Sequence, residues 1–193
     1  EITASPDWLT AALETNLFTF TSGGAFSDIA FANDQFYLTD FGSNAIFTVN
    51  QLGENLTRIA GAGDGSSGFV DGDVAAARFD VPFAVDVAAN GDVYVIDQQN
   101  HALRKISGNT VSTIAGNGTP GFSDGPCAPT LATFNEPNNL LIATNGDIYI
   151  SDAGNGVIRL LSATTGEITT LQDGSGSNLI FNSPYGLALD DNG

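Results

Sequence analysis

The feature that most constrains this chain is a short pattern that occurs three times, an apolar run that contains Tyr and ends in Asp. Its tyrosines, Tyr37, Tyr94 and Tyr149, are separated by 57 and 55 residues. The second and third copies follow Asn-Gly-Asp, and Asn-Gly between apolar runs is the strongest short-range signal for a β-hairpin. A repeat of this length indicates an array of similar units, none of which buries a core on its own.

Each unit divides into four expected strands. In the middle unit these are residues 83–88, 93–97, 102–106 and 111–115, joined by short polar turns and followed by a long Gly-rich crossing. The second strand decides the architecture, because Val93-Tyr94-Val95-Ile96 has no polar face and must be covered on both sides. Tight hairpins make each sheet antiparallel, so other sheets must provide the covers, as in the radial stack of a β-propeller.

The repeat therefore predicts an all-β chain, a β-propeller of four-stranded antiparallel blades with three full blades and the start of a fourth. The blades are assigned to residues 24–79, 80–134, 135–182 and 183–193. The partial fourth blade is expected to open with a strand at 186–189. Three blades do not close a ring, so we expect the ring to be completed by residues missing from this chain or by another chain.

Residues 1–23 fall outside the repeat and form a separate N-terminal unit. Ser5-Pro6-Asp7 predicts a short helix near residues 6–14, because Ser is a capping residue and Pro is preferred at the first helical position. Residues 17–20 have the pattern of a strand, which would close the ring by joining the last blade.

The charge of the chain excludes some partners. Its 22 acidic and five basic residues give a net charge of −17. Nucleic-acid binding depends on Lys and Arg that neutralise phosphates, and anionic membranes attract the same residues, so we expect neither as a partner. No apolar run approaches the length that crosses a bilayer, and membrane insertion is not expected.

Further motifs resemble the NHL-repeat family. Asn100-His101-Ala102-Leu103-Arg104 is similar to the motif that names the family, Asn155-Gly156-Val157-Ile158-Arg159 is a second copy, and Asn44-Ala45-Ile46-Phe47 is a weaker one. The crossings at residues 59–79 and 114–134 resemble those of a common subtype. The resemblance implies a propeller and leaves the function open, because propellers carry many functions. Its frequent use in secreted proteins, with the acidic charge, leads us to expect an extracellular or otherwise exported protein.

Several polar residues are expected to be structural. Asp40, Asp97 and Asp152 end the second strands, and an active site needs one constellation rather than one copy per blade. Their carboxylates are therefore predicted to accept backbone N–H groups of the following turn. His101, the only histidine, has no clustered partners in the sequence and is also expected to be structural.

We interpret the chain as a non-enzymatic recognition scaffold that binds a protein or glycan partner through the loop face, a role that would fit a larger extracellular assembly. Stacked blades form a rigid body, and loops on rigid elements commonly form binding surfaces. The residues predicted for this partner face are Phe83, Asn138, Asn139 and Tyr185 at the channel mouth, with Asp71 and Asp124 in the crossings. Phe69 and Phe122 either join that face or plug the space between blades.

The alternative is a metal-dependent hydrolase or lactonase. Six-bladed hydrolases of the gluconolactonase type hold a divalent metal in the channel, and Asn138 matches their Asn by its place before a strand, with Glu136 as a second ligand. The next blade departs from that pattern, since Tyr185 stands where an Asp would be offered. The main interpretation requires no cofactor, and it leaves open Ca²⁺ or another divalent ion, which would need several converging oxygen ligands.

The charge yields a first prediction. The full chain should not bind single-stranded or double-stranded RNA at micromolar concentration, since its few cations cannot neutralise a run of phosphates. Fluorescence anisotropy at about 50 and about 200 mM salt measures this. Binding that weakens steeply between the two salt concentrations would reveal a basic surface and contradict the prediction.

Overall fold

The computed structural model describes residues 25–124 and 129–189. The helix predicted near residues 6–14 and the ring-closing strand predicted at 17–20 lie outside the described residues. The described residues form strands and two one-turn 3₁₀ helices, η1 (Pro129–Leu131) and η2 (Ala153–Asn155), so the all-β prediction is confirmed. Within this part of the chain, neither helix has the length and apolar character that crossing a bilayer requires.

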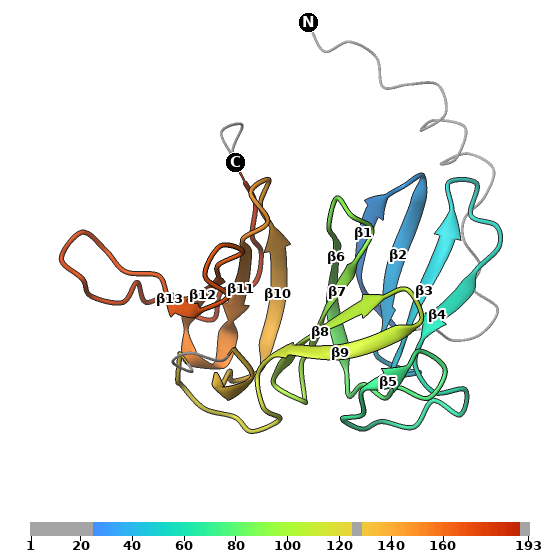
Figure 1. The fold of residues 1–193 in the computed structure, drawn as a ribbon, viewed down its shortest axis with the longest axis horizontal. Helices are drawn as coiled ribbons and strands as arrows, with labels where there is room; N and C mark the ends of the chain where they lie inside the picture. Colours follow the sequence, from blue (N-terminus) through green and yellow to red (C-terminus); the bar gives the residue numbers. More distant parts are fainter. Residues whose placement is uncertain (1–24, 125–128, 190–193) are drawn as a thin grey trace, which may run out of the picture.

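Three antiparallel sheets follow one another along the chain and stand as separate blades (Figure 1). The first blade contains β1 (Phe26–Ala32), β2 (Gln35–Asp40), β3 (Ala45–Asn50) and β4 (Thr57–Ala60). The second contains β6 (Pro82–Val87), β7 (Val93–Asp97), β8 (Ala102–Ser107) and β9 (Thr110–Ala115). The third contains β10 (Pro137–Ile142), β11 (Ile148–Asp152), β12 (Val157–Leu161) and β13 (Ile168–Thr170). These four strands are paired in chain order in every blade, as the repeat predicts.

The second blade also gains a strand that the repeat did not predict. β5 (Gly72–Asp73) belongs to the crossing from the first blade and pairs antiparallel with β9, Gly72 opposite Val111 and Asp73 opposite Thr110. A crossing that pairs with an outer strand satisfies backbone groups that would otherwise form an open sheet edge. This crossing is therefore part of the second sheet as well as the link between two blades.

The strand predicted at residues 186–189 is not found. Residues 184–189 are irregular, and no strand ladder of the described chain includes them. A strand needs the hydrogen bonds of a neighbouring strand, and the described residues supply no such neighbour for this segment. The apolar pattern alone was therefore insufficient, and the prediction is wrong for this structure.

Apolar clusters fill the space between neighbouring blades. Tyr37 of β2 and Val95 of β7 belong to the cluster between the first and second blades. Ile96 of β7 and Ile150 of β11 belong to the cluster between the second and third blades. Val95 and Ile96 point to opposite faces of β7, and both are fully buried. The second strand is therefore covered on both faces, as its apolar run predicts.

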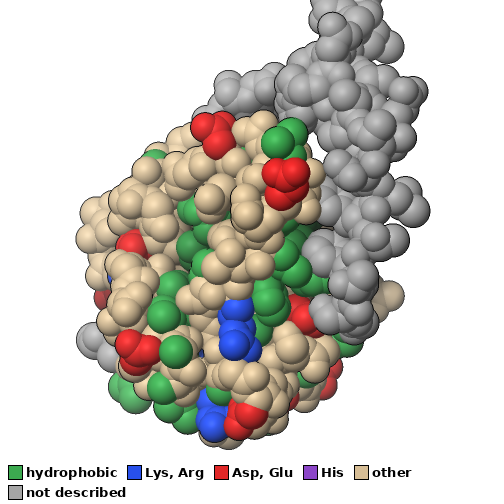
Figure 2. Space-filling model, turned by 90° about the vertical axis from the view of Figure 1, so that its right-hand side faces the viewer, with side chains coloured by type: hydrophobic (Ala, Val, Ile, Leu, Met, Phe, Trp, Pro, Cys, Tyr) green, Lys and Arg blue, Asp and Glu red, His purple; other side chains and the backbone are tan. Residues whose placement is uncertain are grey.

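Hydrophobic side chains are exposed in patches on the outward face of the first blade, among polar side chains and backbone (Figure 2). Ile29 and Phe31 of β1 are 57% and 52% exposed, and the rings of Phe31 and Phe36 lie 4.9 Å apart. The position in β6 that corresponds to Ile29 is Val85, which is only 3% exposed because it packs between blades. The first blade thus presents the kind of face that neighbouring blades bury. Completion of the ring by further residues or another chain stays a prediction.

The first strand of each blade carries a β-bulge at the same place, one residue after its start. One extra residue is inserted there, and the extra residues are Ser27 in β1, Phe83 in β6 and Asn138 in β10. A bulge bends its strand and re-aims the side chain of the extra residue. The bulges therefore set apart one side chain in each blade.

A close backbone contact in the second blade gives a second prediction. Gly116 follows β9 with a φ of +87°, and a Cβ there would lie 2.3 Å from the carbonyl oxygen of His101. Gly116→Ala should therefore lower the free energy of unfolding by more than the roughly 1–2 kcal/mol that a left-handed conformation costs an L-residue. Urea denaturation measures the loss.

The matched control is Gly108→Ala in the turn between β8 and β9. Gly108 also has a positive φ, +54°, but no atom lies within 4 Å of the added Cβ. Its substitution should show the conformational cost without the clash. Equal losses for the two variants would contradict the assigned contact.

Candidate functional site

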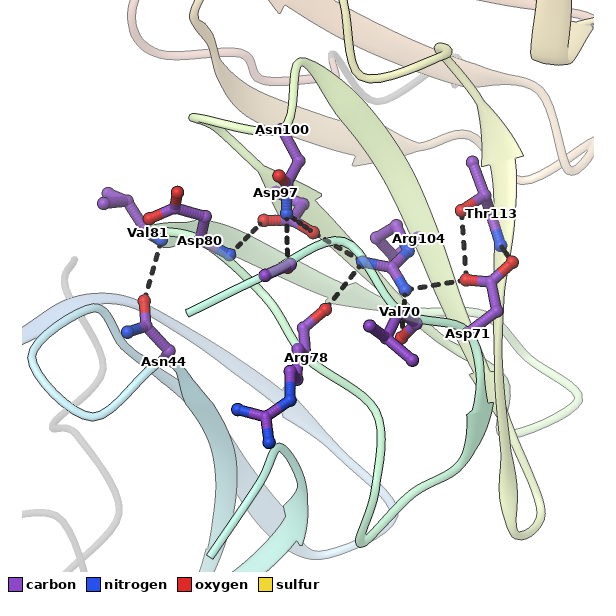
Figure 3. Close-up of polar contacts among 11 residues, drawn as sticks. Asn44, Val70, Asp71, Arg78, Asp80, Val81, Asp97, Asn100, Arg104 and Thr113 are labelled. Carbon is purple, nitrogen blue, oxygen red and sulfur yellow. Dashed lines mark hydrogen bonds and ion pairs between the residues drawn. The ribbon is translucent and has the colours of Figure 1, made fainter. Parts of the chain in front are cut away.

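A buried arginine ties the second blade to the crossing before it (Figure 3). Arg104 of β8 is fully buried, and its guanidinium donates to Asp97 Oδ2 at 2.6 Å and to Asp71 Oδ1 at 2.7 Å. The rings of Phe69 and Phe79 lie 5.0 and 5.1 Å from the guanidinium carbon. A buried charge is tolerated when it is paired and hydrogen-bonded, and this one contacts two carboxylates and two aromatic faces.

The third blade repeats the arrangement around Arg159 of β12. Its guanidinium donates to Asp152 Oδ2 at 2.9 Å and to Asp124 Oδ1 at 2.7 Å. The rings of Phe122 and Phe134 lie 5.3 and 5.2 Å from it. We call each buried arginine, with its two aspartates and two phenylalanines, an arginine anchor. Each anchor joins a blade to the crossing that leads into it.

Two residues predicted for the partner face belong to these anchors. The carboxylates of Asp71 and Asp124 each bind a buried arginine while their side chains stay 48% exposed. Their principal partner is therefore inside the protein, and the structure separates them from the rest of the predicted face. Phe69 and Phe122 are 39% and 53% exposed, and each ring lies against the buried arginine of its anchor. Their place in the partner face stays a prediction.

Asp40, at the end of β2, has the role that the sequence predicts. Its Oδ1 accepts the N–H of Gly42 at 2.9 Å and that of Ser43 at 3.3 Å, in the turn that follows the strand. The Ser43 hydroxyl donates to the other carboxylate oxygen at 2.8 Å. The carboxylate therefore caps this turn.

Asp97 and Asp152 differ from that prediction. Asp97 accepts the N–H of Asp80 at 2.7 Å, and Asp152 accepts the N–H of Asn135 at 2.8 Å. Both donors lie ahead of the first strand of the same blade rather than in the following turn. Burial raises the pKa of Asp97 to about 6, against the opposing effects of Arg104 and of its hydrogen-bond donors. These two carboxylates thus connect an arginine anchor to the entry of its blade.

His101 has a structural role at the contact between the second and third blades. It adopts a left-handed conformation with a φ of 49°, and its Nδ1 accepts the backbone N–H of Glu136 at 3.1 Å. Burial lowers its pKa, against the charges of Glu136 and Asp152, and the neutral ring that accepts this hydrogen bond is favoured. The imidazole therefore positions the backbone just before the bulge of β10.

A pocket of about 350 Å³ opens beside the starts of the first strands, at the place that the sequence analysis predicts as the channel mouth. The residues that line it are Ser27, Asp28, Phe83, Asn138, Asn139, Tyr185 and Gly186. The structure thus brings together four of the six residues predicted for the partner face, namely Phe83, Asn138, Asn139 and Tyr185.

The sequence prediction missed Ser27 and Asp28. The first copy of the repeat is degenerate, with Asn33-Asp34 in place of Asn-Gly, and this concealed its first strand. The spacing to the repeated tyrosine was the signal that remained. Ser27 lies ten residues before the tyrosine of its unit, and Phe83 and Asn138 lie 11 residues before theirs.

The bulge position has the same geometry in each blade but a different chemistry. It presents a hydroxyl at Ser27, a phenyl ring at Phe83 and an amide at Asn138. Tyr185 follows Pro184 as Asn138 follows its own proline, so a phenol takes the fourth place. Four corresponding residues with different side chains therefore converge on one pocket.

Asn138 is the least exposed polar residue of the pocket. Its side chain belongs to a residue that is 2% exposed, and its Oδ1 has no hydrogen-bond partner among the described residues. A buried acceptor without a donor costs about 1–3 kcal/mol, and such groups are rare in native proteins. The amide oxygen is therefore a buried acceptor at the pocket wall that the described residues leave without a donor.

Asp28 contributes the only carboxylate among the described lining residues. Its Oδ2 accepts the N–H of Val85 at 3.0 Å, which links β1 to β6. Burial raises the pKa of Asp28, the nearby charge of Asp86 acts in the same direction, and the N–H groups of Val85 and Ile29 oppose the shift. The pocket therefore contains a partly desolvated carboxylate.

The residues of the metal-site alternative do not converge here. Glu136 is exposed and does not line the pocket that contains Asn138. In the described ranges 25–124 and 129–189, no three His, Cys, Asp or Glu side chains form a group that could hold a metal ion. The set of Asn138 and Glu136 thus lacks the several oxygen ligands that a hard cation requires.

Similar proteins confirm the resemblance predicted from the motifs. NHL repeat-containing protein 2 of Bos taurus is 31% identical over 121 residues, which are 61% of this chain and 16% of that protein. Its Homo sapiens counterpart is 29% identical over 96 residues, 48% of this chain and 13% of that protein. The Arabidopsis thaliana protein SUPPRESSOR OF QUENCHING 1, chloroplastic, is 36% identical over 88 residues, 45% of this chain and 8% of that protein. No family profile matches the chain.

Solved structures confirm the fold. An auxiliary nutrient binding protein from Bacteroides ovatus superposes with a TM-score of 0.65 at 20% identity, over 86% of this chain and 43% of that chain. A second such protein, from Bacteroides thetaiotaomicron, superposes with a TM-score of 0.60 at 24% identity, over 77% of this chain and 38% of that chain. The fold is that of a β-propeller, and its motifs are similar to those of NHL-repeat proteins. The chain spans less than half of these structures and less than a fifth of its curated relatives.

The arginine anchors give a third prediction. Arg104→Met should lower the free energy of unfolding by about 3–5 kcal/mol, because it leaves the carboxylate of Asp97 buried without its counter-ion. The neighbouring Lys105→Met is the matched control, since Lys105 is partly exposed and lies 3.6 Å from Asp92. That variant should lose less than about 1 kcal/mol. Urea denaturation followed by circular dichroism measures both, and similar losses would contradict the role given to Arg104.

Proposed function

We propose that this chain is part of a non-enzymatic recognition scaffold that binds a protein or glycan partner at the channel mouth. The observation that carries the proposal is a pocket lined by four different side chains, three from the bulge position of a blade and one, Tyr185, from the irregular segment after the third blade. Positions that carry the same residue type in successive blades, such as the arginine anchors, maintain the fold. Positions that correspond between blades but carry different residue types are free to match a partner.

The rigidity of the pocket wall supports the same function. Ser27, Phe83 and Asn138 lie on strands rather than on free loops, and the blades that carry them pack through apolar clusters. A binding site that is already ordered loses less conformational entropy when its partner arrives. The pocket is therefore suited to recognition without a large rearrangement.

The names of similar structures agree with a binding role, since two of them are called auxiliary nutrient binding proteins. Their likeness to this chain is one of fold, so the partner is inferred from the pocket. An exported location and a place in a larger extracellular assembly belong to the same proposal.

Asn138→Leu tests the proposal because it separates binding from stability. If the buried amide serves a partner, its removal should leave the free energy of unfolding unchanged or raise it by up to about 2 kcal/mol, since an unpartnered acceptor is lost. Binding to the partner should fall. The measurements are urea denaturation, and NMR shifts of the full chain on titration with panels of soluble glycans and peptides.

Asn100→Leu is the control for this variant. Asn100 is also a buried asparagine, but its Nδ2 donates to Asp97 Oδ2 at 2.9 Å and to the Gly68 carbonyl at 2.8 Å. Its substitution should destabilise the fold and leave the affinity of the folded protein unchanged. If Asn138→Leu behaves in the same way, Asn138 is structural and the proposal fails.

A further inference from the structure

The pocket at the channel mouth contains negative charge without a matching positive charge. None of its described lining residues is Lys, Arg or His. The ion pairs found in the described chain use other aspartates, and Asp28 takes part in none of them. The charged group that acts on Asp28 most directly is Asp86, which is also an acid. An anionic ligand would therefore meet no counter-ion among the described lining residues.

The hydrogen-bonding groups of the pocket also favour a donor. Asp28 uses Oδ2 for one N–H of the neighbouring blade, and a carboxylate has several further acceptor positions. Asn138 adds a buried amide oxygen with no partner among the described residues. Ser27 is already engaged, because its hydroxyl lies 3.0 Å from that of Thr39. A ligand that brings several N–H donors would satisfy both free acceptors.

Two aromatic rings complete the pocket. Tyr185 is 62% exposed, and Phe83 is the bulged residue of β6. Aromatic faces attract cations, and they do so more strongly where water is partly excluded. A carboxylate, a free amide oxygen and two rings are a combination that binds a positively charged nitrogen better than a neutral polyol.

We propose that the channel-mouth pocket binds a protonated amine, with Asp28 as its counter-ion, Asn138 Oδ1 as a second acceptor and the rings of Phe83 and Tyr185 beside it. This inference rests on the proposed recognition function and names the chemistry of what is recognised. An amino sugar and the lysine side chain of a protein partner carry the same group. The net charge of −17 favours the approach of either source.

The test uses the full chain and two matched pairs of probes. Glucosamine is compared with glucose, and Nα-acetyl-lysinamide with Nα-acetyl-norleucinamide, by isothermal titration calorimetry and NMR. In at least one pair the amine should bind about tenfold or more tightly than its neutral partner, a difference of about 1.4 kcal/mol. The pair that shows the difference identifies the source, a glycan or a lysine side chain.

Two aspartate variants assign the effect to the pocket. Asp28→Asn should lower the affinity for the amine about tenfold and leave the neutral probe unchanged. Asp86→Asn is the matched control, because Asp86 Oδ2 accepts the N–H of Ile142 at 2.8 Å, just as Asp28 accepts an N–H of the next blade, but it does not line the pocket. Its effect on affinity should stay within about threefold.

Three outcomes would overturn the amine inference. Equal binding of both members of each pair, lost in Asn138→Leu, would leave the recognition function standing and make the pocket a neutral polar site. Amine binding that survives Asp28→Asn would place it elsewhere on the acidic surface. No binding by any of the four probes would reject the amine, and the recognition function would then be decided separately by the partner panels and the Asn138→Leu variant.

Discussion

The buried guanidinium groups of Arg104 and Arg159 determine how this chain joins one blade to the next. Each is fully buried and binds a carboxylate from its own blade and another from the crossing that leads into it. A charge in such a place is stable only while all its partners are present, since each ion left alone would keep the cost of desolvation. The crossing is therefore held in one path, although it contains little regular structure of its own.

The geometry of the pocket depends on these anchors. Asp97 receives the N–H of Asp80, and the next residue, Val81, has a φ of 55°, which is unusual for a β-branched residue. Asn44 of the first blade accepts the N–H of Val81 at 2.9 Å and holds this conformation (Figure 3). Phe83 follows two residues later. The bulged side chain is thus aimed by an ion pair and a cross-blade hydrogen bond, and not by its own preferences.

The sequence predicted what depends on local pattern. The Tyr-containing runs, the Asn-Gly turns and the apolar character of Val93-Tyr94-Val95-Ile96 were sufficient for the strands, their order and their burial. The contacts that the sequence did not predict join residues distant in the chain. Arg104 donates to Asp71 across 33 residues, and Asp28 accepts an N–H of Val85 across 57. Spacing placed Asn138 at the predicted channel mouth, but only packing shows that its oxygen lacks a partner among the described residues. The strand prediction for residues 186–189 was wrong for a related reason, because an apolar pattern does not show whether a neighbouring strand is present to pair with it.

The bulge at the start of each first strand places a different side chain at the same point of each blade. The ladder tolerates an extra residue there, but Phe83 also packs against the apolar cluster between the second and third blades. A substitution at Tyr185, which is 62% exposed, changes mainly one wall of the pocket, whereas one at Ser27 also removes hydrogen bonds to Thr39 and to the Pro82 carbonyl. Each blade therefore contributes one bulged side chain to the pocket. A substitution at one of these positions can change which ligand is recognised, while the order and pairing of the strands stay the same.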